Sequence, residues 1–257
     1  MSPARGWLAE RMAEARIAMM TLSRLPAGRA ADPAPEMAAA SWAFPLVGAL
    51  IGSIAAAAYA VATAAGLPPV FSALIAVTAG IMATGAIHED GLADLADGLG
   101  GGQSRKRKLE IMRDSHIGVY GVLALLLALA MRVVCITTIA APMAVAWALI
   151  AIAITSRTAI VVALYAMPPA RADGLGQSAS NVTLVSCAIA STIGIAALAL
   201  ITDAWLALTI TLAIAATGAA LAWLAWRQIG GQTGDVLGAI QQCTEIAGLA
   251  AVVAYIG

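Results

Sequence analysis

The chain has 257 residues, of which 61% are hydrophobic and only 11% charged, and its formal net charge is zero. Soluble domains of this size are about one quarter charged, so the composition argues against a soluble protein. The balanced charge gives no field that would attract nucleic acid, and no nucleic-acid partner is expected. The three cysteines lie apart in apolar runs without CxxC spacing, so neither a disulfide framework nor a zinc site is indicated.

The first 36 residues predict an amphipathic helix at the membrane interface. Six apolar side chains fall on one face at helical spacing: Trp7, Leu8, Met12, Ala15, Met19 and Leu22. Charged residues interrupt the segment, so it does not have the apolar core of a signal peptide. We expect this segment, 1–36, to be cytoplasmic or interfacial.

Seven apolar stretches follow, each about long enough to cross ~30 Å of hydrocarbon. Their predicted ranges are 42–65, 70–88, 118–140, 143–167, 182–201, 204–226 and 236–256. The stretches show no alternation of apolar and polar residues with period two, so a membrane β-barrel is not indicated. A soluble all-α protein is disfavoured because successive segments lack a polar face. The sequence therefore predicts an all-α, polytopic membrane helical bundle of about seven spans, forming a single domain over 1–257.

Basic residues predict the orientation of these spans. Twelve of the fourteen fall in the N-terminal segment or in the long connections 89–117, 168–181 and 227–235: Arg5, Arg11, Arg16, Arg24, Arg29, Arg105, Lys106, Arg107, Lys108, Arg113, Arg171 and Arg227. In a seven-span arrangement all twelve lie on one side, which the positive-inside rule makes cytoplasmic. The C-terminus is then expected on the opposite side.

Carboxylates gather directly after the second apolar stretch. Asp90, Asp94 and Asp97 have helical spacing, with Glu89 at the shoulder of the same face. Carboxylates this close repel one another unless a cation lies among them. Oxygen ligands suit Mg²⁺ or Mn²⁺. The segment 89–117 is therefore predicted to be a cytoplasmic active-site segment.

Glycines and basic residues follow the carboxylates. Glycines at 98 and 100–102 would let the backbone turn and approach a phosphate. The basic run 105–108 and Arg113 would neutralise it. The alternative is a solvated loop, and for Lys106 and Lys108 a role in topology alone is equally open.

Polar residues inside the spans form a second group. Arg132 and Arg157 lie near mid-span, so we expect them to face the interior or a wet cavity, with Glu245 as a partner. A cavity near these arginines is expected to admit part of a substrate. Asp235, in the Gly-rich stretch 230–239, is either a second-site metal ligand or an N-cap of the last span.

Several motifs together resemble one family. "DGLADLADGLGGG", "RKLEIMRDSHIGVYG", "SRLP", "WAFPLVGALIG" and "GQTGDVLGAIQQCTE" span most of the chain in the order of the cobalamin synthase family, the adenosylcobinamide-GDP ribazoletransferases. The family motif usually has an arginine where this chain has His116. Histidine can also donate to phosphate, with a charge that depends on pH.

The resemblance implies a Mg²⁺-dependent, multi-pass inner-membrane enzyme with its active site facing the cytoplasm. Such an enzyme joins adenosylcobinamide-GDP to α-ribazole, or to its 5′-phosphate, forms adenosylcobalamin or its 5′-phosphate, and releases GMP. The expected metal ligands are Glu89, Asp90, Asp94 and Asp97. Catalytic roles are expected for Asp90, Asp94, Asp97 and Asp114, with Asp97 or Asp114 accepting the hydroxyl proton. Substrate or phosphate contacts are expected from Arg24, Gly98, Gly101, Arg105, Arg107, Arg113, His116, Arg157, Thr233, Asp235 and Glu245. Homo-oligomer formation stays open.

Two other functions share parts of this pattern. A CDP-alcohol phosphotransferase also begins its signature with Asp-x-x-Asp-Gly, which "DLADG" at 94–98 matches, but the rest of that signature is absent. A cation or metabolite transporter would place its ion site near the midplane on interrupted helices. The carboxylates here are expected at the cytoplasmic end of a span, which favours chemistry at the surface.

Overall fold

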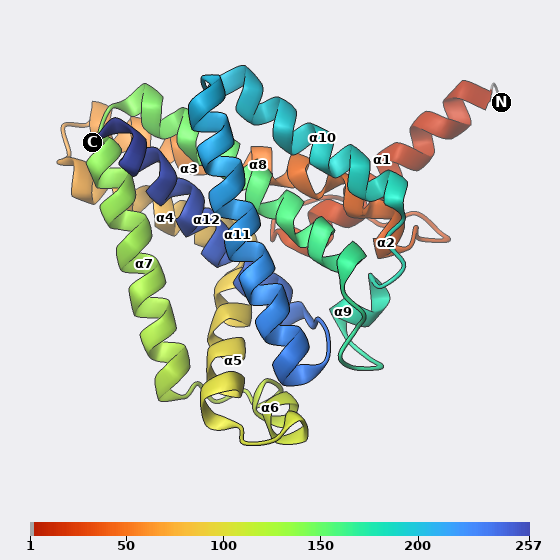
Figure 1. Ribbon diagram of the computed structural model, residues 1–257. Coiled ribbons are helices and arrows are strands. Elements are labelled where there is room, and N and C mark those ends of the chain that lie inside the picture. Colours follow the sequence, from red (N-terminus) through yellow and green to blue (C-terminus); the bar gives the residue numbers. More distant parts are fainter. Residues whose placement is uncertain (1–2) are drawn as a thin grey trace.

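The computed structural model describes residues 3–257, and these residues form helices without a β-strand (Figure 1). The helices are α1 (Pro3–Leu22), α2 (Met37–Ala40), the 3-10 turn η1 (Ser41–Ala43), α3 (Phe44–Ala64), α4 (Pro69–Thr84), α5 (Ile87–Gly101), α6 (Arg105–Ile111), α7 (Val119–Ile139), α8 (Pro142–Ala166), α9 (Leu175–Ser178), α10 (Leu184–Ile201), α11 (Ala204–Ile229) and α12 (Gly234–Ile256). The all-α membrane bundle is confirmed.

Six helical stretches are long and apolar enough to cross a membrane: Met37–Ala64, α7, α8, α10, α11 and α12. The predicted span 70–88 differs from the structure. Helix α4 ends at Thr84, and α5 leaves it at 89°. Gly85 and Ala86 turn the chain there, both with positive φ, at 69° and 60°. The pair α4–α5 counts as a seventh span only if both helices are taken together. We treat α5, which carries four carboxylates, as lying outside the spanning helices.

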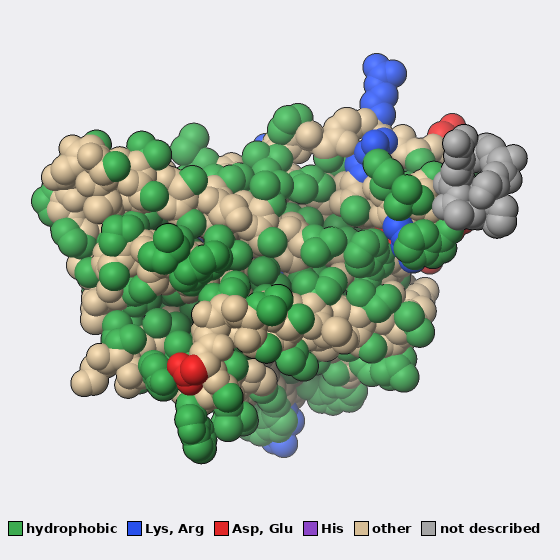
Figure 2. Space-filling view, turned by 90° about the horizontal axis from the view of Figure 1, so that it is seen from above, with side chains coloured by type: hydrophobic (Ala, Val, Ile, Leu, Met, Phe, Trp, Pro, Cys, Tyr) green, Lys and Arg blue, Asp and Glu red, His purple; other side chains and the backbone are tan. Residues whose placement is uncertain are grey.

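The bundle has a buried centre and an apolar periphery. Two thirds of the most apolar window of α8 and of α12 is buried, against about one tenth for α11. Large apolar side chains cover the outer helices, among them Leu200 on α10 and Trp205 and Trp223 on α11. Figure 2 shows one such face, on which hydrophobic side chains predominate and few charged ones appear. This surface is suited to lipid.

Close packing at the centre depends on two glycines of α3. A Cβ added at Gly48 would lie 2.3 Å from the Ala153 carbonyl oxygen, and one at Gly52 would lie 2.7 Å from Ile150 Cα. Both contacts are too short for a real side chain. Glycine at these positions therefore lets α3 and α8 approach backbone to backbone, as small residues commonly do in membrane bundles.

The tight turns and the C-terminus lie at one end of the bundle. The Tyr59 hydroxyl at the end of α3 donates to the Ala140 carbonyl between α7 and α8, at 2.9 Å. Tyr255, next to the C-terminus, donates to Asp203 between α10 and α11, also at 2.9 Å. These contacts agree with the predicted placement of the C-terminus beside the turns that lack basic residues.

The long connections meet at the other end, shown at the bottom of Figure 1. Ala170 N donates to Gln232 O and Gln232 N to Pro168 O, both at 2.8 Å, which joins the connections 168–181 and 227–235. Arg105 of α6 donates to the Ile229 carbonyl at 2.7 Å. The basic connections therefore share one end, as the charge pattern predicts.

Helix α1 is attached to the bundle through its second half. Glu14 is buried, accepts from Trp42 Nε1 at 2.6 Å and pairs with Arg11 at 2.8 Å. Trp7 and Met12 in the first half are exposed. The helix itself is confirmed, and an interfacial position for its exposed apolar half stays a prediction.

Candidate functional site

Helix α5 packs between α7 and α12, so its four carboxylates meet different surroundings. Asp90 is exposed and Asp94 half-buried. Both line a pocket of about 450 Å³ between α5, the segment 112–117 and α7. Among the described residues, neither side chain has a hydrogen bond or an ion pair. These two carboxylates are free to bind a ligand.

Asp97 was predicted to bind metal and to serve as a base, but in the structure it accepts hydrogen bonds from the start of α7. It is buried, and its two oxygens accept the backbone N–H groups of Gly118 at 2.6 Å and Gly121 at 2.9 Å. It thus caps the N-terminus of α7, whose own N-cap position is a glycine without a side-chain acceptor. A glycine at the N-cap position, where Ser, Thr, Asp or Asn is usual, was the sequence signal for an acceptor supplied from elsewhere.

Glu89, a predicted metal ligand at the rim of the same pocket, belongs to a buried ion-pair network. Its Oε1 accepts from Arg132 at 3.0 Å and from Gln242 at 3.1 Å. Arg132 also pairs with Glu245 at 3.4 Å, and Gln241 donates to Glu245 at 2.5 Å. The expectation that Arg132 faces the interior with Glu245 as its partner is confirmed. Glu245, expected to contact substrate, lies in this network.

Arg157 is 2% exposed, which confirms its interior position. It donates to the Ala153 carbonyl at 3.1 Å. The cavity beside Arg132 and Arg157 measures only about 40 Å³. Such a volume holds a few waters, so it gives no support to the expectation that this cavity admits part of a substrate, which stays a prediction.

Asp235 faces α5 from the first turn of α12. Gly91 and Gly238 allow this approach, because a Cβ added at Gly91 would lie 3.0 Å from Asp235 Cα and one at Gly238 3.1 Å from the His88 carbonyl oxygen. The N-cap of α12 is Thr233, which accepts from Val236 N, so Asp235 is not the cap. Thr233, expected to contact phosphate, also donates to Asp235 at 3.1 Å.

The electrostatics of the site converge on Asp94. Burial, followed by the neighbouring charges of Asp90 and Asp235, raises the pKa of Asp94 from 3.8 to about 7, and Arg171 opposes this shift. Arg171 pairs with Asp235 at 2.5 Å. Sequence reasoning counted Arg171 only as an orientation signal. Arg171 lies in a polar connection two residues from Asp173, and this position alone does not predict its contact with Asp235.

Some of the basic residues predicted to bind phosphate are held by contacts within the protein, and others could reach a ligand. Arg105 donates to Ile229 O and Ala170 O, and buried Lys108 donates to Gln228. Arg107 pairs with Glu110 at 3.3 Å on the surface. Arg113 lines the carboxylate pocket and pairs with exposed Asp173 at 2.5 Å. An exposed pair is weak, so Arg113 can exchange its partner for a phosphate.

The glycines after the carboxylates do not form the expected turn. Helix α5 continues through Gly98 to Gly101. A Cβ at Gly98 would lie 2.4 Å from Met112 Cγ, and one at Gly102 2.4 Å from Lys108 Cγ. These glycines let α6 and the following segment pack on α5. Phosphate contacts by Gly98 and Gly101 stay predictions.

Asp114 lines the pocket and holds the exposed His116. It accepts from His116 N at 3.1 Å and lies 2.6 Å from His116 Nδ1. These hydrogen bonds lower the pKa of the Asp114 carboxyl. Arg24 lies at the α4–α5 bend, where its backbone N–H donates to the Ala83 carbonyl at 2.8 Å.

The fit of a divalent cation depends on Asp90 and Asp94. Within residues 3–257 no three His, Cys, Asp or Glu side chains converge as a ready ligand group. Mg²⁺, however, is commonly held by one or two carboxylates together with substrate phosphates. Two unpartnered carboxylates in a polar pocket, with mutual repulsion that a cation would relieve, fit that mode of binding.

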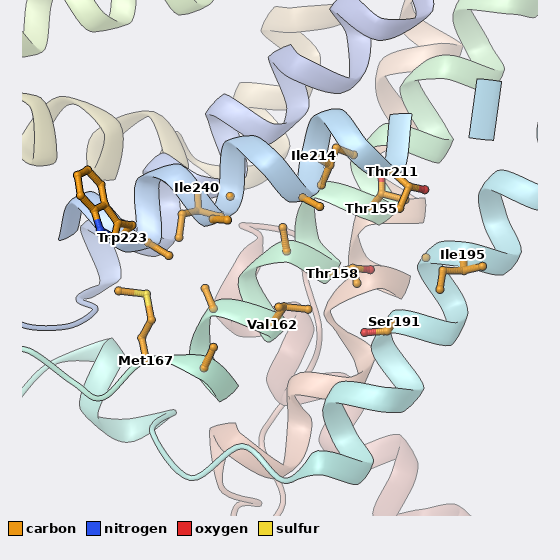
Figure 3. A pocket seen from close by; sticks show the side chains of 18 of the residues that line it. Thr155, Thr158, Val162, Met167, Ser191, Ile195, Thr211, Ile214, Trp223 and Ile240 are labelled. Carbon is orange, nitrogen blue, oxygen red and sulfur yellow. The ribbon is translucent and has the colours of Figure 1, made fainter. Parts of the chain in front are cut away.

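A larger cavity lies elsewhere. It measures about 730 Å³ and is lined by α8, α10, α11 and α12 (Figure 3). The hydroxyls of Thr155, Thr158 and Thr211 donate to carbonyls of their own helices, so they offer this cavity no donor. None of the predicted site carboxylates lines it.

Comparisons with known proteins agree with these features. The family described as cobalamin-5-phosphate synthase matches residues 14–253. The chain is 45% identical to a Bradyrhizobium diazoefficiens protein named adenosylcobinamide-GDP ribazoletransferase, over 91% of each chain. It is 43% identical to the protein of that name from Azorhizobium caulinodans, over 95% of this chain and 96% of the relative. No solved structure matches. With a family match over nearly its whole length, on a membrane bundle whose free carboxylates lie at the basic end, the chain belongs to the cobalamin-5-phosphate synthase family.

Proposed function

We propose that this protein joins adenosylcobinamide-GDP to α-ribazole, or to α-ribazole 5′-phosphate, and releases GMP. The observation that carries the proposal is the group formed by Asp90, Asp94 and Asp235 with Arg113 and Arg171 nearby. The relatives' shared name supplies the substrates. The alternatives of an alcohol phosphotransferase for CDP-linked substrates and of a transporter are not favoured by these relatives.

Asp90 and Asp94 would hold Mg²⁺, which supplies positive charge to the pyrophosphate of the substrate. The donor set supports this assignment, since both carboxylates lack partners among the described residues and line the same pocket. Glu89 and Asp97 are less suited, because an arginine and two backbone N–H groups already engage their oxygens.

The reaction needs a nucleophile, a proton acceptor and a leaving group. A ribose hydroxyl of the ribazole other than the 5′-hydroxyl, which is blocked in α-ribazole 5′-phosphate, attacks the phosphorus that carries the cobinamide. An oxygen–phosphorus bond to that atom forms, the bond from that phosphorus to the GMP oxygen breaks, and GMP departs. Asp235, in the field of Asp94, accepts the hydroxyl proton, and Arg113 neutralises charge on the departing phosphate.

This proton assignment replaces those made from the sequence. Asp97 has both oxygens engaged by α7. Asp114 is engaged by His116, and its lowered pKa makes it a weaker base. Asp235 lies on the other side of α5. Thr233 and Arg171 both contact its Oδ2 atom, and its Oδ1 atom has no partner among the described residues.

The site is further proposed to face the cytoplasm from the inner membrane. Its residues belong to the end of the bundle where α6 and the connections 168–181 and 227–235 meet, and these carry most of the basic residues outside the N-terminal segment. Retention of basic segments in the cytoplasm would place the carboxylates on that side.

The test uses purified protein in liposomes, supplied with adenosylcobinamide-GDP, α-ribazole and Mg²⁺. We expect stoichiometric release of GMP and formation of the joined corrinoid, with loss of both on addition of a chelator. The matched control is Asp235→Asn, which keeps the size of the side chain and should lose turnover. Absence of GMP from well-folded wild-type protein would contradict the proposal.

A further inference from the structure

Helix α5 separates two cavities, and Asp90 lines both. One is the polar pocket described above. The other, of about 140 Å³, lies between α5, α8, α12 and the segment that joins α1 to α3, and we refer to it as the α5–α8 cavity. Building on the proposed function, we propose that the α5–α8 cavity binds the aromatic base of the ribazole, and that its apolar side chains select which bases are accepted.

The lining of the α5–α8 cavity suits a flat apolar ring. Leu22, Met37, Phe44, Ile160 and Leu164 form much of its wall. A cavity of ~150 Å³ with a comparable aliphatic and aromatic lining is large enough to take up benzene. Burial of a ring there removes apolar surface from water, which favours binding.

The polar atoms of the lining suit a heterocycle rather than a hydrocarbon. The Thr21 hydroxyl already donates to the Ile17 carbonyl at 2.8 Å. His88 is only 3% exposed and lines both this cavity and the small cavity beside Arg132, and its Nε2 atom has no hydrogen-bond partner among the described residues. A buried polar atom without a partner is costly. A ring nitrogen of the bound base would supply the missing partner.

The position of the α5–α8 cavity suits the reacting hydroxyl. Asp90 and Asp235 line its edge, and Asp235 is the proposed proton acceptor. A base held in the cavity would direct its attached ribose toward these carboxylates. The phosphorus under attack would then lie near Asp90, between the two cavities.

The nucleotide half of the other substrate fits the remaining pocket. The polar pocket is about three times as large, at about 450 Å³ against 140 Å³, and it contains Arg113. A guanosine diphosphate group needs that room and that charge. The 730 Å³ cavity of Figure 3 does not qualify for the base, because neither Asp90 nor Asp235 lines it.

The experiment changes the size of the α5–α8 cavity and measures the preference for bases. Leu164→Ala enlarges it, and Met37→Trp narrows it. Leu249→Ala is the matched control, since Leu249 and Leu164 are each 1% exposed and Leu249 lines none of the cavities described above. Each protein is assayed with the ribosides of imidazole, benzimidazole, 5,6-dimethylbenzimidazole and naphthimidazole.

We expect Leu164→Ala to shift the ratio of kcat/KM toward the largest base, and Met37→Trp toward the smallest, each by roughly tenfold or more. The KM for adenosylcobinamide-GDP should stay within about twofold of wild type, since that substrate occupies the other pocket. Leu249→Ala should keep the wild-type order of bases. The thermal shift on adding α-ribazole alone should shrink in Met37→Trp, which reports binding without turnover.

Two results separate the failure of this inference from failure of the proposed function. Unchanged base preference in both cavity variants, with active wild-type protein, would overturn the inference and leave the proposed function intact. Wild-type protein that releases no GMP would overturn both. If Leu164→Ala does not fold, Met37→Trp decides alone, because Met37 is only partly buried and its wall can adjust.

Discussion

The four carboxylates of α5 have opposite surroundings. Glu89 and Asp97 are buried, and Arg132, Gln242 and the first turn of α7 engage their oxygens. Asp90 and Asp94 lie in a polar pocket without partners among the described residues. A carboxylate whose lone pairs are engaged holds the fold together, whereas an unpartnered one beside other carboxylates is available for a cation. The predictions below test this contrast.

The largest effect on stability is expected from Arg132→Met, which removes a partner of the buried carboxylates. The replacement removes the ion-pair partner of buried Glu89 and of partly buried Glu245. Breaking such a pair costs about 3–5 kcal/mol of unfolding free energy. Chemical denaturation in detergent micelles would measure this loss. Arg107→Met, which breaks an exposed pair with Glu110, is the control and should cost no more than ~1 kcal/mol. Equal losses for the two variants would refute the contrast.

Among the unpartnered carboxylates, Asp94→Asn should remove activity and keep the fold. Size and shape hardly change, but a cation ligand is lost. We expect turnover to fall by about 10²-fold or more, equivalent to ~2.7 kcal/mol of transition-state stabilisation. GMP release under saturating Mg²⁺ measures the effect, with a thermal melt as the check on folding. Near-normal activity that a chelator does not affect, in a folded variant, would show that Asp94 has a structural role and binds no catalytic cation.

Asp97→Ala should loosen α7 with a smaller cost to the whole protein. The N–H groups of Gly118 and Gly121 lose their acceptor. Loss of a helix cap typically costs about 0.5–2 kcal/mol. Hydrogen exchange should accelerate at these two amides. Asp203→Ala, which uncaps α11 at its exposed end, is the comparison and should leave exchange at 118–121 unchanged. Protection at Gly118 and Gly121 that survives Asp97→Ala would be the contrary result.

A smaller effect should appear in the pH dependence of stability without metal. The pKa of Asp94 is about 7 in the folded protein against 3.8 ordinarily, so between about pH 4 and 7 the folded state binds more protons than the unfolded state. Stability from this group therefore falls as pH rises through that window, and levels above it. With chelator present, the Tm of Asp94→Asn minus that of wild type should be larger at pH 8 than at pH 5. Equal differences at the two pH values would contradict the raised pKa.

The smallest effect is expected from Lys106→Ala. Its side chain is 89% exposed and lies 4.0 Å from Glu110. Stability should change by less than ~0.5 kcal/mol, and GMP release should stay within about twofold. Lys108→Ala is the informative neighbour, because Lys108 is buried and bonded to Gln228, and its loss should be greater. If both lysines behaved alike, burial would not distinguish them.

Much of the bundle could be predicted from the sequence because span length and apolar composition are local properties. The structure confirms six predicted spans as α3, α7, α8, α10, α11 and α12, with ends within a few residues. The second span was less accessible. Its apolar run passes through Gly85, and only the tertiary structure shows that Gly85 and Ala86 adopt positive φ and turn the chain by 89°.

The sequence predicted which residues gather at the candidate site, but not which of them serve the fold and which are free to bind a ligand. Helical spacing correctly placed Asp90, Asp94 and Asp97 on one helix. It could not show that Asp97 serves α7, since that acceptor–donor contact joins residues more than twenty positions apart. Asp235 and Arg171 come from other parts of the chain, and their contribution depends on the close crossing of α5 and α12 at Gly91 and Gly238.

The bend between α4 and α5 has a consequence for the membrane itself. The 16 residues of α4 rise only ~24 Å, less than the ~30 Å of a typical hydrocarbon layer. Such hydrophobic mismatch is relieved by thinning of the bilayer or by a wet recess around the short helix. Either response would lower the water boundary to the level of α5. The carboxylates would then meet dissolved nucleotide within the thickness of the membrane, where a second substrate can rest its apolar part among the helices.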